Sequence, residues 1–194
     1  MGNIPNLLPS LQSEVARVDT LSDLPDDILT HILSFLPYKD AFRTTILSKR
    51  WLPLFHSLSD LNINDEGVNS RKNWTSFRQF MDAIMFSPRS QHVPLKSFHL
   101  KFRYNFWDAN ADRSTIDKWI EVAKQRHVEY LNLLQIPLAP TTVFCCKTLV
   151  VLILMNIRVA NMFRCSVDLP LLKALDMYNV GFDDMENVIR LISG

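Results

Sequence analysis

The sequence predicts a mixed α+β fold in which short helices come first and strand-containing repeats follow. Apolar residues recur at helical spacing between positions 24 and 58, and prolines divide this stretch into short segments. After position 94, a short apolar pattern typical of buried strands appears repeatedly. Hydrophobic residues make up 47% of the chain and charged residues 21%, a balance that favours a folded core over disorder.

The first helix is expected to begin at Pro25, because a proline at this position loses no helical hydrogen bond. Asp26 and Asp27 follow in the first turn, where carboxylates stabilise the positive end of the helix dipole. An apolar stripe then runs to Leu36, and Pro37 ends it. Two more short helices are expected before position 60. The three apolar stripes are wider than such short helices need to cover one another, so another part of the chain or a partner must cover them.

The second half carries four apolar runs of one form, in which apolar residues occupy the first, fourth and sixth positions. The last residues of successive runs are 33, 21 and 23 positions apart. The two shorter spacings are typical of leucine-rich repeats, whose parallel strands stack into a solenoid. Amphipathic helices are expected at 74–86 and from Ser114, with Asp117 as its capping partner. The runs themselves are 95–100, 128–133, 149–154 and 172–177.

Side chains between the apolar positions of each run are expected to point outward from the strand. The candidate target-binding residues at these positions are His99, Asn132, Ile153 and Asp176. The repeats are irregular, because the asparagine of the usual pattern falls one place early, at 156 and 179. The chain also stops within a helical pattern over 185–192, so we interpret it as a fragment or a shortened form.

The stretch from Leu24-Pro25-Asp26-Asp27-Ile28-Leu29 to Ser48-Lys49-Arg50-Trp51 closely resembles the F-box motif. It is most similar to plant F-box/leucine-rich-repeat proteins, some of which carry a further FBD domain that has no counterpart here. The resemblance implies a three-helix F-box followed by a short, irregular leucine-rich-repeat α/β solenoid. The expected divisions are a flexible tail (1–18), the F-box (19–62), a connecting helical segment (63–94) and a partial repeat region (95–194).

The resemblance also implies a non-catalytic role, as the substrate-recognition adaptor of an SCF-type cullin–RING ubiquitin ligase. The F-box would bind a Skp-type adaptor, and through it a cullin, while the repeats would bind an unknown protein target. The same resemblance places seven residues in or beside the adaptor contact: Leu24, Pro25, Ile28, Leu29, Leu36, Leu47 and Trp51. An aromatic side chain among aliphatic ones is typical of interface hot spots.

Other chemistry finds little support in the sequence. The chain has four glycines and no glycine-rich phosphate loop, its histidines form no metal pair, and we expect no cofactor and no metal. The cysteines at 145, 146 and 165 are expected to be reduced structural thiols, although the sequence leaves a nucleophilic pair of Cys145 with His127 open. The longest apolar run, 149–155, is too short to cross a membrane, which favours the cytoplasm and/or nucleus.

Two alternatives remain open at this point. One is a leucine-rich-repeat scaffold whose F-box engages no adaptor. The other is association with nucleic acid through residues 61–127, which contain eleven Lys and Arg residues and seven Asp and Glu residues. The net charge of the whole chain is only +1, which argues against a nucleic-acid binder. A steep salt dependence of nucleic-acid binding would favour the second alternative, and salt-insensitive binding of a Skp-type adaptor would favour the ligase.

Overall fold

The computed structural model describes residues 21–103, 111–136, 138–139, 141–159 and 167–183, together with Glu186 and Ile189. The expected N-terminal tail, Cys165 and most of the helical pattern over 185–192 lie outside the described residues. The described residues combine helices with one sheet, so the predicted mixture of helix and strand is confirmed.

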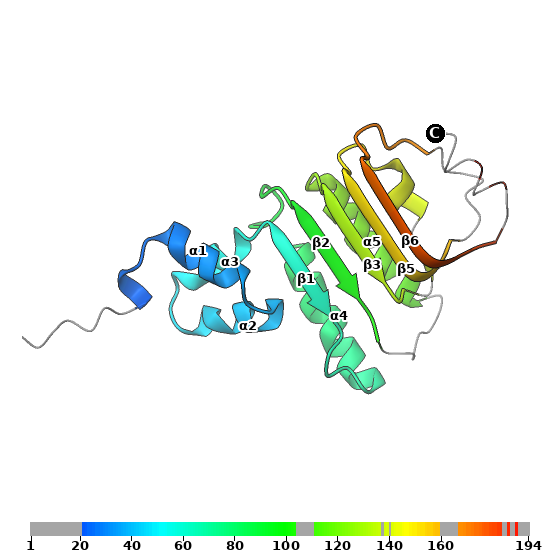
Figure 1. Cartoon of the computed structure of the whole chain (residues 1–194). Helices are drawn as coiled ribbons and strands as arrows, with labels where there is room; N and C mark the ends of the chain where they lie inside the picture. Colours follow the sequence, from blue (N-terminus) through cyan, green and yellow to red (C-terminus); the bar gives the residue numbers. More distant parts are fainter. Residues whose placement is uncertain are drawn as a thin grey trace, which may run out of the picture.

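Short helices make up the N-terminal part of the described chain, which lies at the β1 end of the sheet (Figure 1). Pro25 directly precedes α1 and Pro37 directly precedes α2, at positions where a missing N–H leaves no helical bond unmade. Pro53 falls in the first turn of α3, where it is tolerated for the same reason. The elements are η1 (Leu21–Asp23), α1 (Asp26–Ser34), α2 (Tyr38–Arg43), η2 (Thr44–Ile46) and α3 (Trp51–His56).

The rest of the described chain forms a curled parallel sheet (Figure 1). Its strand order is β1-β2-β3-β5-β4, and β6 pairs with the free side of β5. The strands are β1 (Asp60–Asn64), β2 (Ser97–Lys101), β3 (Tyr130–Leu134), β4 (Leu138–Ala139), β5 (Val151–Val159) and β6 (Ala174–Phe182). Each of the four predicted runs overlaps the first part of one of these strands, and the parallel ladder agrees with a repeat-like fold.

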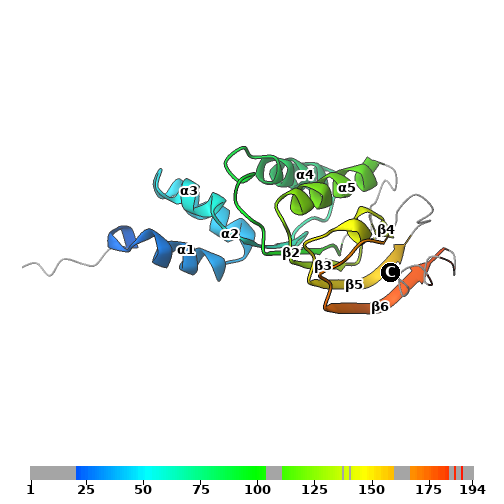
Figure 2. The same ribbon diagram turned by 90° about the horizontal axis from the view of Figure 1, so that it is seen from above.

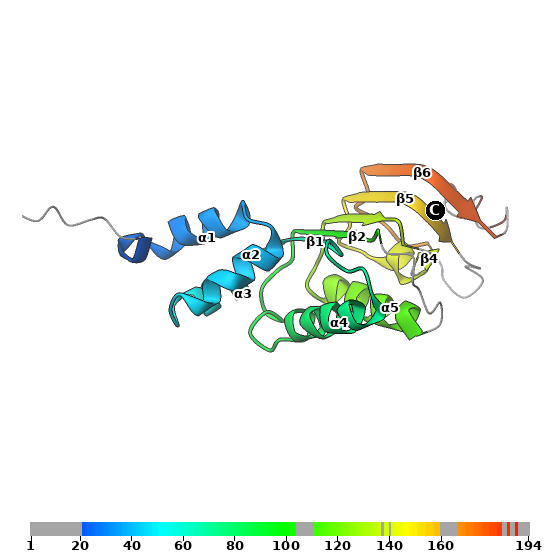
Figure 3. The same cartoon turned by 90° about the horizontal axis from the view of Figure 1, so that it is seen from below.

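Helices cover one face of this sheet. Figures 2 and 3 show α4 (Arg71–Met85) and α5 (Ala111–Gln125) side by side on the same side of β1, β2 and β3. The short η3 (Thr141–Cys145) follows β4 and packs against α5. We call the helix-covered side the inner face of the sheet and the opposite side its outer face.

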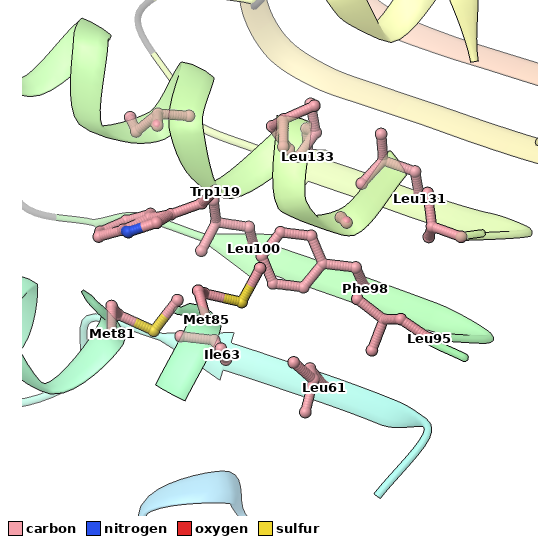
Figure 4. Close-up of a cluster of buried hydrophobic side chains, with 14 of the residues drawn as sticks. Leu61, Ile63, Met81, Met85, Leu95, Phe98, Leu100, Trp119, Leu131 and Leu133 are labelled. Atoms are coloured by element: carbon pink, nitrogen blue, oxygen red, sulfur yellow. The ribbon is translucent and has the colours of Figure 1, made fainter. Parts of the chain in front are cut away.

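The core lies between the inner face and the helices (Figure 4). Alternate strand residues point inward, as the period of a strand requires. Trp119 of α5 is fully buried, and its indole Nε1 donates a hydrogen bond to Asp82 Oδ1 of α4 at 2.8 Å, which ties the two helices together. The inward strand residues are Leu61, Ile63, Phe98, Leu100, Leu131, Leu133, Leu152 and Leu154, all buried.

Two elements differ from the sequence-based expectation. The helix predicted to begin at Ser114 begins one turn earlier, at Ala111, so the prediction that Ser114 caps it is wrong. A first residue of high helix propensity allows this extra turn. The strand β1 was not predicted, because its two inward residues, Leu61 and Ile63, make an alternation too short to stand out.

The early asparagines occupy a special backbone position. Gln135, Asn156 and Asn179 have φ values of 58°, 52° and 50°, in the left-handed region. They are equivalent in the repeats, since the residues directly before them are aligned in the strand register. Asn179 Nδ2 also donates a hydrogen bond to Asn156 Oδ1 at 2.9 Å. Asparagine adopts this conformation more readily than most residues, which gives a physical reason for its place here.

Candidate interaction surfaces

Arg50 joins the start of α1 to the start of α3. Its Nε donates to Asp26 Oδ1 at 2.7 Å, and its Nη2 donates to the carbonyl oxygen of Leu24 at 2.6 Å. Both acceptors suit the guanidinium fork, and the carboxylate adds an ion pair. The two segments that carry the F-box resemblance are therefore linked by a side chain of the second segment. The sequence alone did not indicate this role for Arg50, because the linked residues lie more than twenty positions apart.

Three of the seven expected adaptor-binding residues, Leu24, Leu29 and Trp51, lie in or against the core of the helical part. Leu29 and Trp51 are buried, so in this structure they pack the helices together. Leu24 is partly buried and packs against the hydrophobic core, while Pro25 beside it is exposed. The Leu24–Pro25 pair thus has one side chain anchored in the protein and one facing solvent.

The other three expected residues, Ile28, Leu36 and Leu47, are exposed to solvent. Sequence reasoning did not select three further exposed apolar residues of these helices: Phe35, Phe42 and Ile46. The sequence indicated exposed apolar residues only through the excess width of the apolar stripes. This width does not show which residue of a stripe points into the core and which points to solvent. Among the described residues, twelve large apolar side chains are exposed, and seven of them lie between positions 21 and 47. The exposed apolar surface is therefore concentrated in the helical part.

The four expected target-binding residues lie in one row across the outer face. The strand register pairs His99 with Asn132, Asn132 with Ile153, and Ile153 with Asp176. On the unpredicted strand β1, Asn62 pairs with His99 and extends the row. The helices α4 and α5 lie on the opposite face (Figures 2 and 3), and at the β1 edge Leu33 and Ser34 of α1 share a pocket with Asn62 and His99. The structure thus brings together all four residues, although it does not test whether they bind a target.

The first outward-facing residues of the strands form a neighbouring row on the outer face. This row lines a shallow hollow of about 520 Å³. Asp60, Ser97, Tyr130 and Val151 are aligned in this row by the strand register. Ser97 Oγ donates a short hydrogen bond to an Asp60 carboxylate oxygen, and Ser59 Oγ donates to the other oxygen at 2.9 Å. These hydroxyls fix the carboxylate on the first strand of the sheet.

His99 forms one wall of the same hollow. Its ring lies 5.0 Å from the ring of Tyr130, centre to centre, with an angle of 33° between the planes. The Asn132 amide nitrogen lies 3.5 Å from His99 Nδ1, at the limit of a hydrogen bond. Burial lowers the pKa of His99 below its ordinary value, and the nearby Asp60 carboxylate opposes this shift. Near pH 7 the ring is therefore neutral.

The candidate metal-ligating and thiol residues lie among the described residues, except Cys165. No group of three or more His, Cys, Asp or Glu there could hold a metal ion. Cys146 is buried, and Cys145 is partly buried with its Sγ 3.4 Å from the carbonyl oxygen of Thr142. His127 adopts a left-handed backbone conformation (φ 59°) directly after the α5 segment. No described helix is both long enough and apolar enough to cross a membrane.

Comparison with known proteins places these surfaces in context. The F-box domain family matches residues 21–62, which includes all the α-helices before β1 and most of β1 itself. An F-box/LRR-repeat protein of Arabidopsis thaliana is 35% identical over 185 residues, covering 91% of this chain and 47% of the relative. A putative F-box/FBD/LRR-repeat protein of the same plant is 32% identical over 180 residues, covering 89% of this chain and 39% of the relative.

The chain thus spans less than half the length of these curated relatives. A further putative F-box/LRR-repeat protein of Arabidopsis thaliana is 36% identical over 123 residues, which are 59% of this chain and 22% of the relative. No solved structure matches the chain significantly. Residues 21–62 form an F-box domain, and over most of its length the chain is a homologue of plant F-box/LRR-repeat and F-box/FBD/LRR-repeat proteins.

Proposed function

We propose that this chain is a substrate-recognition adaptor of an SCF-type cullin–RING ubiquitin ligase. Residues 19–62 form a three-helix F-box that docks a Skp-type adaptor, which in turn binds a cullin. Residues 63–94 connect it to a partial leucine-rich-repeat solenoid at 95–194, whose outer face holds a protein target. The chain itself performs no chemistry, and it acts by raising the effective concentration of the target near the ligase, in the cytoplasm and/or nucleus.

The concentration of exposed apolar residues in the F-box domain carries this proposal. Burying a large aliphatic or aromatic side chain contributes about 1.5–3 kcal/mol. Leaving several of these side chains in water therefore costs free energy, which a partner that covers them would recover. Seven of the twelve exposed large apolar residues within the described part of the chain lie in this domain, although it is a minor part of the sequence. Apolar patches of this kind mark protein–protein interfaces.

Co-purification with a Skp-type adaptor tests the proposal. Wild-type chain is compared with the Leu24→Ala/Pro25→Ala double variant and with Phe86→Ala, which removes an exposed apolar side chain next to α4, outside the F-box domain. We expect a stoichiometric complex with wild type and Phe86→Ala, and none with the double variant, at unchanged helix content by circular dichroism.

The other outcomes separate the remaining possibilities. A complex that survives in the double variant would show that Leu24 and Pro25 are not the contact residues. If folded wild-type chain forms no complex, the ligase role is wrong, and a repeat scaffold with a non-engaging F-box replaces it.

A further inference from the structure

The hollow on the outer face, at the start of β1, β2 and β3, contains an unmatched negative charge. Asp60 accepts hydrogen bonds from the hydroxyls of Ser59 and Ser97, and no ion pair links it to a Lys or Arg among the described residues. An ionised carboxylate can accept about four hydrogen bonds, so capacity for a further donor remains. The two hydroxyls hold the carboxylate in position without neutralising it.

The other charges around the hollow offset each other. Lys96 and Glu129 both line it and directly precede β2 and β3, where the Glu129 amide donates to the Lys96 carbonyl oxygen at 3.2 Å. Their formal charges sum to zero, and burial disfavours the charged form of His99, which lowers its pKa. The hollow as a whole therefore carries the single negative charge of Asp60.

An aromatic and aliphatic wall lies next to this charge. The Tyr130 and His99 rings stand close together, at 5.0 Å between centres, and Val150 and Val151 line the hollow on the side of β5. A planar cation can stack on an aromatic face while it donates hydrogen bonds from its edge. Guanidinium combines both properties, and its parallel N–H groups match the geometry of a carboxylate.

We propose that this hollow binds an arginine side chain of the protein target, with its guanidinium donating to Asp60 and stacking on Tyr130. The arginine stem then packs on Val150 and Val151. The proposal rests on the proposed function only in calling the bound protein a target of the ligase. Asp60 lies within residues 21–62, which match the F-box domain, but the binding chemistry itself needs no adaptor contact. It also selects one part of the outer face, beside the row of His99, as the specificity-determining site.

Peptide titration of the whole chain, followed by NMR signals of His99 and Tyr130, tests the assignment. The probe is N-acetyl-Gly-Arg-Gly-amide, and the same peptide with citrulline in place of arginine is the uncharged control of equal shape. Asp60→Asn keeps the shape and the hydroxyl contacts but removes the charge. Glu66→Gln removes an exposed carboxylate beyond the other end of β1, outside the hollow, and serves as the matched control.

We expect the arginine peptide to shift the His99 and Tyr130 signals of wild type and Glu66→Gln with equal affinity. Asp60→Asn is expected to weaken binding about three- to fivefold, the size of one solvent-accessible ion pair. The citrulline peptide is expected to bind wild type as weakly as the arginine peptide binds Asp60→Asn. Equal binding of both peptides, an equal loss in Glu66→Gln, or no titratable shift in wild type would each overturn the proposal.

Adaptor binding measured on the same samples keeps the two proposals apart. Asp60→Asn should retain the Skp-type adaptor, since Asp60 begins β1 and is not one of the exposed apolar residues of the F-box helices. If Asp60→Asn loses peptide binding and retains the adaptor complex, the substitution affects the hollow and not the adaptor contact. Peptide binding without an adaptor complex refutes the ligase role and leaves the hollow in place.

Discussion

The exposed and buried apolar residues of the F-box domain should respond in opposite ways to truncation. Ile46 in η2 is 84% exposed, whereas Leu33 in α1 is 1% exposed. Both side chains are aliphatic and of similar size, and both lie within residues 21–62. Replacing each by alanine therefore separates a surface role from a packing role within one domain.

The expected stability changes follow from these exposures. Full burial of an isoleucine contributes about 1.5–3 kcal/mol, and roughly one sixth of Ile46 is covered, so Ile46→Ala should cost about 0.3–0.5 kcal/mol. Leu33→Ala leaves a cavity in a closed core and should cost about 2–5 kcal/mol. Urea denaturation of the two variants measures this difference as a shift of the midpoint.

Adaptor affinity should change in the reverse order. A side chain at the centre of an interface contributes about 1 kcal/mol or more on truncation, so Ile46→Ala should raise the Kd for the Skp-type adaptor at least about fivefold. The folded fraction of Leu33→Ala should bind with nearly wild-type affinity. An Ile46→Ala variant that loses more than about 1 kcal/mol of stability, or that binds the adaptor like wild type, would refute this reasoning.

Two further predictions concern the sheet. Asn179→Gly should be nearly neutral, whereas Asn179→Val should cost about 1–2 kcal/mol in urea denaturation, because both lose the bond to Asn156 but only valine is strained at φ 50°. Equal stabilities of the two variants would contradict the explanation that the left-handed backbone conformation at position 179 disfavours valine. Since Asp60 raises the lowered pKa of His99, Asp60→Asn should lower this pKa further in an NMR titration, and an increase would contradict the assigned cause. The pKa of His99 is lower in the folded state than in the unfolded state, so His99 should destabilise the fold as the pH falls below about 6.5. A stability that rises on acidification through this range in wild type, but not in His99→Gln, would contradict this prediction.

The order and type of most elements could be predicted from local pattern. Each of the four apolar runs overlaps the first part of a strand, and the helix expected at 74–86 is found at Arg71–Met85. Periodicity identifies such elements because burial of one face imposes the spacing. The same principle predicted that His99, Asn132, Ile153 and Asp176 point outward, and the parallel register of the structure aligns them in one row.

Features that depend on distant contacts could not be predicted. The stripe residues Leu33 and Ile46 look alike in sequence, yet one is buried and the other exposed, because the packing of three helices decides which side is covered. The strand β1 has too few apolar residues to be recognised alone, and only its pairing with β2 defines it. The hollow around Asp60 likewise requires side chains from four strands that lie far apart in the sequence.

The strands of the sheet are unequally protected against local opening. Within the described part of the chain β6 pairs only with β5, and its inward residue Met177 is exposed, although the aligned Leu154 is fully buried. In a stack of units held by nearest-neighbour contacts, a unit supported on one side opens at a lower free energy than the units between neighbours. Amide hydrogens of β6 should therefore exchange with solvent well before those of β2 and β3. The outer-face hollow is lined by no residue of β6, so opening of β6 would leave the walls of the hollow in place.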